Sequence, residues 1–297
     1  MQEIKTILFP VEFSTQSDAG LERVRFLAKK FNSKVVLLHV IPETPVFLLT
    51  SPQTERYLEI VKSKALDILE ELRSQLADEG IEAESELREG KVYLEIVCAA
   101  KEKGADLIVM LRHGEYGSTV MKVVSKAHPP VYVVQNKPIT GINSILFPTD
   151  LSGPAGFSWR YTVNLAEQLD AKITVIHVHE MPLHWQDIEA ELQAYFPEYT
   201  ELMGKEVEER SLNALRSIYR DDKVEIDYLV RVAPDAATEI VNVASQIGAD
   251  LIVMATHGRT GLKKILLGSV TEKVVRISDV DLIVVRPPEF QVELSKK

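Results

Sequence analysis

Short apolar runs alternate along the chain with longer segments of helical periodicity. Runs such as DLIVM at 250–254 contain no polar interruption after the first residue, which is typical of strands covered on both faces of a parallel sheet. In the second half of the chain, the runs predict strands at 145–147, 172–178, 224–230, 250–255 and 281–285, with helices between them. We therefore expect an α/β, doubly wound architecture.

The same pattern occurs twice. TILFPVEFS at 6–14 returns as SILFPTDLS at 144–152, and GADLIVM at 104–110 recurs unchanged at 248–254. The chain therefore predicts two tandem doubly wound domains, each a five-stranded, mainly parallel sheet flanked by helices. The expected boundaries are 1–137 and 143–297, and the Pro- and Gly-containing stretch NKPITGIN at 136–143 is the expected linker.

Composition and charge narrow the class of partner. The 297 residues are 45% hydrophobic and 26% charged, which is typical of a folded globular protein, and the formal net charge is −10. That charge disfavours nucleic acid and anionic lipid as partners of the whole surface. The chain has no apolar run long enough to span a bilayer, its N-terminus lacks the layout of a signal peptide, and Cys98 is the single cysteine, so we expect a cytoplasmic protein.

A glycine-containing loop follows the fourth strand of the second copy. Its sequence is HGRTGLKKILLGSV at 257–270, and its glycines can turn backbone N–H groups toward an anion. Ser269 and Val270 begin a helical pattern whose N-terminus would point the same way. The P-loop and G-x-G-x-x-G motifs are absent. The loop's basic residues, Arg259, Lys263 and Lys264, could contact phosphate, although a solvated position for the two lysines is the alternative that we favour.

An acidic residue follows the first strand of the same copy. In FPTD, Asp150 comes directly after the strand, at the sheet edge where a carboxylate can accept ribose hydroxyls or face a phosphate-bound metal ion. A plain turn position remains an alternative for this residue. Together with the loop, Asp150 favours a site for a phosphorylated ribose compound.

Given this loop, Asp150 and the internal repeat, the chain resembles the universal stress protein family. The resemblance is to a tandem form with two such domains and covers nearly the full length of the chain. ATP-binding members of that family carry the motif G-x2-G-x9-G-[ST]. Here Gly258, nine residues, Gly268 and Ser269 match the motif, while Ala255 stands where its first glycine is expected. Family membership is thus indicated by a long and specific spacing.

The resemblance implies an adenine-nucleotide site in the second domain, for ATP or AMP, with or without Mg²⁺. By position, Pro148, Thr149 and Asp150 would lie beside adenine and ribose, and Val178 would hold the adenine through its backbone. Gly258, Gly268, Ser269 and Val270 would cradle the phosphates. The complete expected site comprises Pro148, Thr149, Asp150, Val178, Ala255, His257, Gly258, Arg259, Gly261, Gly268, Ser269 and Val270.

The first copy departs from this pattern. It has Glu12 at the position of Asp150, and its loop after the fourth strand is seven residues shorter. We therefore expect a degenerate site that binds nucleotide poorly or not at all. The resemblance also implies contacts through the fifth strands, so that the two domains would pair as a pseudo-dimer within the chain. The whole chain would then form a homodimer. A separate protein partner is also expected, and the sequence does not identify it.

Catalytic and metal-ligating candidates are weaker. His257 and His113 occupy matching places in the two copies, as do His177 and His39, so we interpret them as structural and assign no catalytic residue. His177 and His179 form an H-x-H pair near His184, but the pattern lacks a definite further ligand, and we assign no metal. The favoured function is nucleotide-binding regulation in a stress response. A slow Mg-dependent ATP hydrolase and a nucleotide-free interaction scaffold remain the alternatives.

Overall fold

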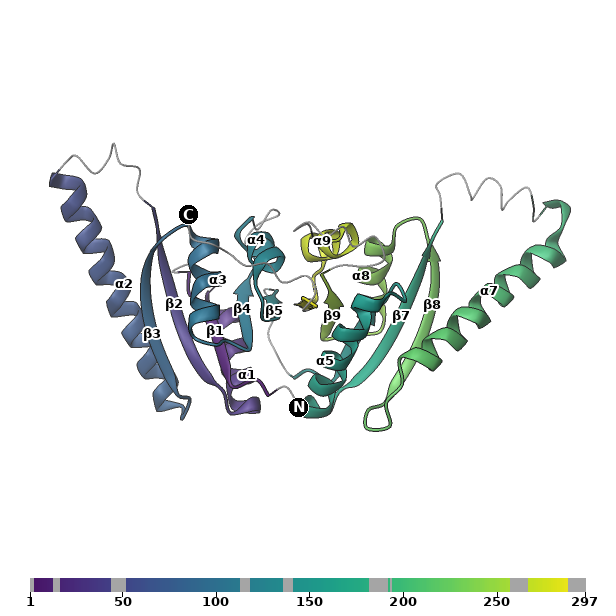
Figure 1. The fold of residues 1–297 in the computed structure, drawn as a ribbon, viewed down its shortest axis with the longest axis horizontal. Helices are drawn as coiled ribbons and strands as arrows, with labels where there is room; N and C mark the ends of the chain where they lie inside the picture. The colour runs from purple at the N-terminus through teal and green to yellow at the C-terminus, as the bar shows by residue number, and fades with distance from the viewer. Residues whose placement is uncertain are drawn as a thin grey trace. The chain divides into compact units, whose positions relative to one another are not determined.

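The computed structural model describes residues 3–12, 17–43, 52–112, 118–135, 141–181, 192, 194–256 and 267–287. Internal contacts divide the chain into two compact units (Figure 1). Unit 1 contains the described residues up to Gln135, and unit 2 contains those from Gly141 to Pro287. Each unit is described by itself below.

Unit 1 is a parallel five-stranded sheet with the strand order β3-β2-β1-β4-β5. Its strands are β1 (Thr6–Pro10), β2 (Lys34–Pro42), β3 (Ala83–Gly90), β4 (Leu107–Leu111) and β5 (Val131–Val134). Its helices are α1 (Ser17–Phe31), α2 (Pro52–Asp78), α3 (Val92–Glu102) and α4 (Ser118–Lys126). The central strand β1 pairs with β2 and β4.

Unit 2 repeats this arrangement with the strand order β10-β9-β6-β7-β8, again parallel throughout. Its strands are β6 (Ser144–Pro148), β7 (Lys172–Glu180), β8 (Ile226–Ala233), β9 (Leu251–Ala255) and β10 (Asp281–Val285). Its helices are α5 (Gly153–Leu169), α7 (Pro197–Ile218), α8 (Ala236–Gln246) and α9 (Ser269–Ile277). The predicted fold class, two tandem α/β domains with parallel sheets, is confirmed.

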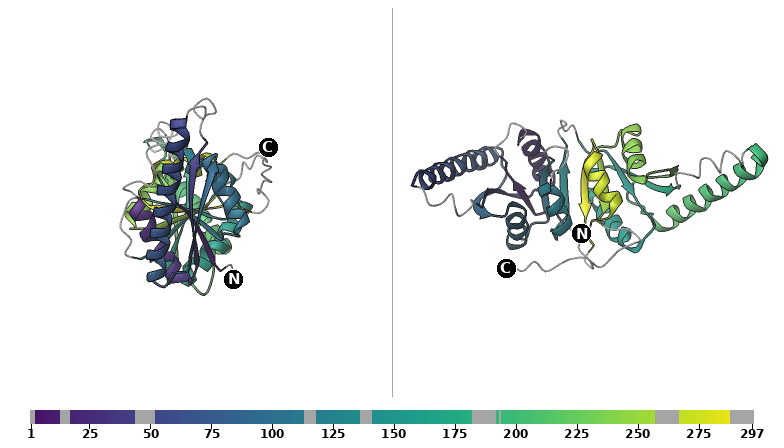
Figure 2. Two further views of the ribbon diagram at one scale, coloured as in Figure 1. Left: turned by 90° about the vertical axis from the view of Figure 1, so that its left-hand side faces the viewer. Right: turned by 90° about the horizontal axis from the view of Figure 1, so that it is seen from above.

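The sheets are buried because helices lie on both sides of the strands in each unit (Figure 2). Strands β4 and β10 are buried at every position, which explains their continuous apolar sequences. The expected range for β8 was wrong: the strand begins at Ile226 and runs to Ala233 instead of occupying 224–230. Its C-terminal residues are strand because Val232 and Ala233 pair with His179 and Glu180 of β7.

In each unit, an aspartate holds the start of the first strand by the same pair of hydrogen bonds. The Asp106 carboxylate accepts hydrogen bonds from the N–H groups of Lys5 (2.9 Å) and Thr6 (3.0 Å). In unit 2, the Asp250 carboxylate accepts from Asn143 (2.8 Å) and Ser144 (3.0 Å). Charged acceptors of backbone N–H groups make strong hydrogen bonds. The repeat in the sequence is therefore a repeat of specific contacts as well as of strands.

Candidate functional site

A cavity of about 490 Å³ opens in unit 2 at the carboxyl ends of three neighbouring strands, β6, β7 and β9. The first residues of helices α8 and α9 complete its wall. In open α/β sheets this edge, where the chain leaves the strands, is the usual place for ligands. The lining residues are Pro148, Thr149, Asp150, Ala155, Ile176, His177, Val178, His179, Glu180, Ala236, Ile240, Met254, Ala255, Gly268, Ser269, Val270 and Thr271.

The structure brings the described part of the sequence-predicted site together in this cavity. Four separate segments contribute, because β6, β7, β9 and the start of α9 end or begin at the same edge. The predicted residues on its wall are Pro148, Thr149, Asp150, Val178, Ala255, Gly268, Ser269 and Val270. The other predicted residues, His257, Gly258, Arg259 and Gly261, lie outside the described residues.

The loop after β6 is held by a buried threonine. Thr149 Oγ1 lies 2.6 Å from the Tyr219 hydroxyl and accepts a hydrogen bond from Leu151 N–H at 3.0 Å. Leu151 adopts a positive φ of 63°, a conformation that a branched side chain rarely takes. Next to it, the Asp150 carboxylate accepts from Ser152 N–H at 3.1 Å. The position of Asp150 at the cavity is thus set by contacts on both sides of it.

Two histidines of β7, His177 and His179, line the cavity. His177 Nδ1 lies 2.7 Å from the Thr149 carbonyl oxygen, and the corresponding His39 Nδ1 lies 2.8 Å from the carbonyl oxygen of Val11 in unit 1. This shared contact supports the structural interpretation of the pair. The rings of His177 and His179 are 4.6 Å apart at 82°, and His179 Nε2 lies 2.8 Å from the Ser211 hydroxyl.

The start of helix α9 presents backbone donors to the cavity. Gly268 is the N-cap residue, so the residue at this position has no side chain that could cap the helix. Gly268 N–H donates to the Thr256 carbonyl oxygen at 2.8 Å, and Thr271 Oγ1 donates to the Ala255 carbonyl oxygen at 2.8 Å. The first N–H groups of a helix have no partner within the helix and attract anions together with the helix dipole. This end of the cavity is therefore suited to phosphate.

Two carboxylates near the cavity accept hydrogen bonds from the start of helix α8. The Glu180 carboxylate accepts from Ala236 N–H at 2.9 Å at the start of α8. Asp235, at the N-cap of the same helix, accepts from Thr238 N–H and pairs with Lys273 at 2.9 Å. Hydrogen bonding to Thr238, followed by that to Lys273, lowers the pKa of Asp235 from 3.8 to about 2. Both carboxylates are thus engaged in capping α8.

Sequence reasoning missed several residues of the site. Ala236 and Ile240 line the cavity from α8, and Tyr219 fixes Thr149 from 70 residues away. The strand-end rule could have found Ala236, because it follows β8 at the ligand-binding edge. Tyr219 gave no such signal: it follows α7, and its buried ring packs against Phe147 and Trp159 at 5.6 and 5.4 Å.

The metal hypothesis gains no third ligand from the described residues. Over the ranges that the structure describes, no three His, Cys, Asp or Glu side chains are grouped so that they could hold a metal ion. His184, the further residue considered for the H-x-H pair, lies outside these ranges. Separately, none of the described helices has both the length and the apolar character needed to cross a membrane.

Comparison with known proteins assigns the fold to a family. The model of the universal stress protein family matches residues 3–135 and again residues 141–286. Universal stress protein MJ0531 of Methanocaldococcus jannaschii is 31% identical over 151 residues, which cover 49% of this chain and 82% of that protein. A universal stress protein of Mycolicibacterium smegmatis is 26% identical over 298 residues, covering 95% of this chain and 97% of its own length.

The solved structures agree with this assignment at the level of the fold. The crystal structure of a universal stress protein from Archaeoglobus fulgidus superposes with a TM-score of 0.69 at 21% identity, and it covers 96% of this chain and 99% of that chain. Two family matches along one polypeptide explain the internal repeat. The chain belongs to the universal stress protein family and contains two of its domains in tandem.

Proposed function

We propose that unit 2 binds an adenine nucleotide, ATP or AMP, and that the protein is a nucleotide-responsive regulator in a cytoplasmic stress response. The observation that carries this proposal is the cavity, which combines a helix N-terminus that begins at Gly268 with a carboxylate, Asp150, on a loop held in place by Thr149. Its volume of about 490 Å³ lies in the range of small-ligand pockets.

The lining residues fit the parts of such a ligand. The start of α9, with Gly268 and Ser269, offers backbone N–H groups to the phosphates. The Asp150 carboxylate is suited to accept ribose hydroxyl hydrogen bonds. Val178 lies on the cavity wall near the end of β7, where its backbone is suited to the edge of the base. The family resemblance supports the same placement.

We propose further that unit 1 contributes little or no binding. Val11 and Glu12 stand at the positions of Thr149 and Asp150, so unit 1 lacks the threonine that holds the loop. Leu111 replaces Ala255 at the end of the fourth strand, and its side chain is buried. The expected stoichiometry is therefore one nucleotide per chain. The intrachain pseudo-dimer of the two domains and a role for Mg²⁺ also remain proposals.

Calorimetric titration of nucleotide-stripped protein tests the site. ATP and AMP are each added with and without Mg²⁺ to the wild type, to Gly268→Val and to Gly156→Val. Gly268→Val places a branched side chain at the helix start and should weaken binding by about 100-fold or more, since it obstructs the phosphates. Gly156→Val is the matched control, because a Cβ at Gly156 meets open space. Circular dichroism checks that both variants are folded.

The outcomes separate the candidate functions. One site per chain that is lost in Gly268→Val and kept in Gly156→Val supports the proposal. Equal affinity in the two variants overturns the assignment of the site. If the wild type binds neither nucleotide, the chain is a scaffold. Multiple-turnover phosphate release that disappears in Asp150→Ala would instead establish the hydrolase.

A further inference from the structure

The outer strand of unit 2 is mostly apolar. β8 lies at the end of the strand order of its unit, with β7 as its neighbour on one side. Its sequence IDYLVRVA contains two charged residues, Asp227 and Arg231, and Val232 is 56% exposed. An edge strand presents unpaired N–H and C=O groups, and proteins usually protect such edges with charged side chains or prolines.

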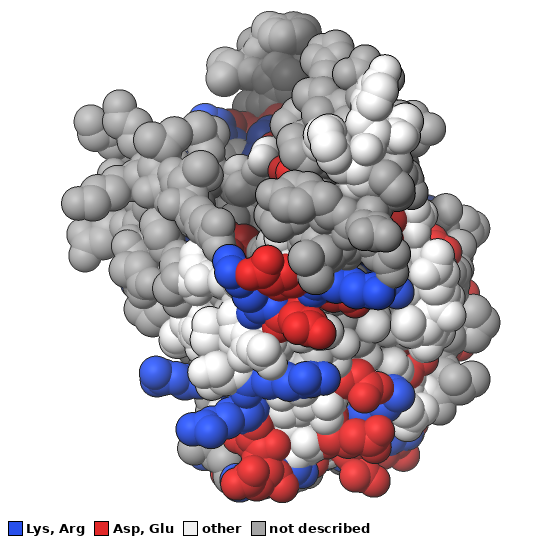
Figure 3. Space-filling view, turned by 90° about the vertical axis from the view of Figure 1, so that its right-hand side faces the viewer, with Lys and Arg blue, Asp and Glu red and all other residues white. Residues whose placement is uncertain are grey.

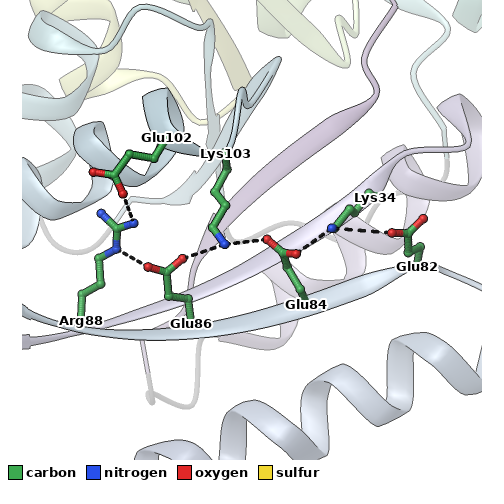
Figure 4. A network of polar contacts seen from close by, with 7 residues as sticks. All are labelled: Lys34, Glu82, Glu84, Glu86, Arg88, Glu102 and Lys103. Atoms are coloured by element: carbon green, nitrogen blue, oxygen red, sulfur yellow. Dashed lines mark hydrogen bonds and ion pairs between the residues drawn. The ribbon is translucent and has the colours of Figure 1, made fainter.

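The equivalent strand of unit 1 carries that protection. On β3, Glu84, Glu86 and Arg88 form a chain of contacts with Glu102 at the end of α3 and with Lys103 directly after it (Figure 4). Lys103 Nζ lies 2.9 Å from Glu84 Oε1 and 3.1 Å from Glu86 Oε2, and Arg88 Nε lies 2.6 Å from Glu86 Oε1. Hydrogen bonds from Lys34 and then Lys103 lower the pKa of Glu84. These cations therefore favour the charged form of Glu84.

Two of the matching positions in unit 2 are apolar, while Asp227 and Arg231 stand at the positions of Glu84 and Arg88. Alignment of the paired strands places Leu229 at the position of Glu86, and alignment of the helices places Ile247 at the position of Lys103. Ile247 is 37% exposed. Figure 3 shows the side of the molecule on which β8 and α7 lie, and uncharged atoms there lie between bands of charged side chains. Unit 2 therefore keeps the pairs Lys172–Asp227 and Arg231–Glu239 at the two ends of β8 but lacks the charges that join them in unit 1.

The direction of the backbone groups on β8 follows from its bonds to β7. Ile173 N–H donates to the Glu225 carbonyl oxygen, and Met181 N–H donates to that of Ala233, so the odd-numbered residues face β7. Because backbone groups alternate along a strand, the even-numbered residues from 226 to 232 point their N–H and C=O groups away from β7, toward the side on which no described strand lies. These are the groups that another strand could pair with.

We propose that β8 pairs antiparallel with β8 of a second copy of this chain, about a two-fold axis at Leu229. In this register, Leu229 faces the same residue of the second copy, and Asp227 and Arg231 face each other across the axis in both directions. The even-numbered residues face one another, as hydrogen bonding between the two edges requires. Tyr228 lies opposite Val230. The pairing therefore joins apolar residues to apolar residues and opposite charges to each other.

Charge selects this register. A two-fold axis at Asp227 or at Arg231 would place like charges directly opposite each other, which destabilises a strand pair. The same arrangement on β3, with its axis at Glu86, would oppose two carboxylates. Asp227 already pairs with Lys172 at 3.3 Å, and Arg231 with Glu239 at 3.8 Å. Their side chains are 57% and 41% exposed, so each has surface left for a second partner. Arg231 would give up its 3.1 Å hydrogen bond to the Val230 carbonyl oxygen, which the second copy would replace.

Charge reversal in the full chain tests the proposal, which does not depend on nucleotide binding. Sedimentation velocity over a concentration series should show that Asp227→Arg halves the mass of the wild-type assembly. The dissociation constant should rise on the order of 100-fold, because two attractive pairs become repulsive. Asp227→Arg combined with Arg231→Asp should restore the assembly. Glu82→Arg is the matched control, since Glu82 has 75% side-chain exposure in unit 1 and its reversal changes net charge equally.

A cross-link tests the register directly. Cα atoms of opposed residues that do not exchange hydrogen bonds lie about 4.5 Å apart, which suits a disulfide. In a Cys98→Ala background, Leu229→Cys should form a covalent dimer with oxidised glutathione, whereas Glu86→Cys should not. A monomeric wild type at about 100 μM, a scale at which weak assemblies form, would overturn the proposal. So would an assembly that Asp227→Arg leaves unchanged, or a cross-link that is no faster in Leu229→Cys than in Glu86→Cys.

Discussion

Units 1 and 2 share a backbone plan and many contacts, yet they differ at the strand ends and at the outer strand. Both use an aspartate before the fourth strand to hold the first strand, and both use a lysine at the start of the second strand to pair with the third. Lys34 lies 2.6 Å from Glu84, and Lys172 lies 3.3 Å from Asp227. What the units share stabilises the fold, and what they do not share lies where ligands and partners would bind.

One difference is which element carries the larger side chain where the first helix packs against the fourth strand. We call this the helix–strand exchange. Unit 1 has Gly20 on α1 and Leu111 on β4, whereas unit 2 has Ser158 and Ala255 at the aligned positions. A Cβ added to Gly20 would lie 2.9 Å from Leu111 Cγ and 2.9 Å from Phe9 Cζ. The small residue in unit 1 is therefore required by the large one. In unit 2 the small residue is on the strand, beside the cavity.

Substitutions at the two positions of this exchange in unit 1 should have the largest effect on stability. Leu111→Ala leaves a cavity and should cost about 2–5 kcal/mol of the free energy of unfolding of unit 1. Gly20→Ser overpacks the same space and should cost about 1–3 kcal/mol. The double variant should lose less than the sum, because the added side chain occupies the vacated space.

Urea unfolding measures this, with a separate signal for each unit. Trp159 and Trp185 both belong to the second half of the sequence, so tryptophan fluorescence reports unit 2 while circular dichroism reports both units. The variants should shift the dichroism transition and leave the fluorescence transition in place. Strict additivity of the two substitutions would refute the proposed exchange.

A smaller effect on stability is expected at the buried pair of hydroxyl groups in unit 2, Thr149 and Tyr219. Thr149→Val copies the residue of unit 1, Val11, and leaves the Tyr219 hydroxyl without its 2.6 Å partner. The expected cost is about 1–2 kcal/mol for Thr149→Val or for Tyr219→Phe, and less than the sum for both together. Tryptophan fluorescence during urea unfolding measures it. Equal and additive losses would contradict a coupled pair.

The same tyrosine makes this difference depend on pH. Burial raises the pKa of Tyr219 above its ordinary value of 10.0. The folded chain therefore retains a proton that the unfolded chain loses, and the stability of unit 2 should fall as pH rises above about 10. Tyr219→Phe should flatten this part of the pH profile. A profile that is unchanged in the variant would assign the effect to other groups.

The smallest effect is expected at the start of the third helix of the repeat. Unit 1 has Lys91 at the N-cap of α3 without a side-chain hydrogen bond, whereas unit 2 has Asp235 capping α8. Lys91→Asp should stabilise unit 1 by about 0.5–1 kcal/mol, and Asp235→Ala should destabilise unit 2 by a similar amount. Urea unfolding with the two signals separates these shifts.

Acid titration provides the control. The pKa of Asp235 is lowered to about 2, so its contribution to stability is present above 3.8 and is lost as pH falls from 3.8 toward 2. Asp235→Ala should remove that part of the profile in unit 2, whereas Lys91→Asp should create a similar step in unit 1. If Lys91→Asp does not stabilise unit 1 at neutral pH, the local backbone there does not support a cap.

The sequence predicted most of the fold and part of the candidate site. Continuous apolar runs predicted buried parallel strands, and the repeat placed Asp150 and Ala255 at strand ends and Gly268 before the next helix. Their meeting at one edge could therefore be anticipated. The end of β8 was predicted wrongly, because Arg231 and the alternating exposure of an edge strand obscure the apolar run. Tyr219 was not predicted, since no spacing rule connects a residue after α7 to a loop after β6.

The sequence by itself determined two α/β domains, because the period of apolar residues reports how each segment is buried and the repeat reports that the same solution occurs twice. Only the tertiary structure showed that β8 is an outer strand, that Leu229 lies at the position of Glu86, and that Thr149 meets Tyr219. The physical reason is that local periodicity is the same for many strand orders. The order is selected by contacts between residues far apart in the chain, and these contacts also decide which side chains reach a cavity or an edge.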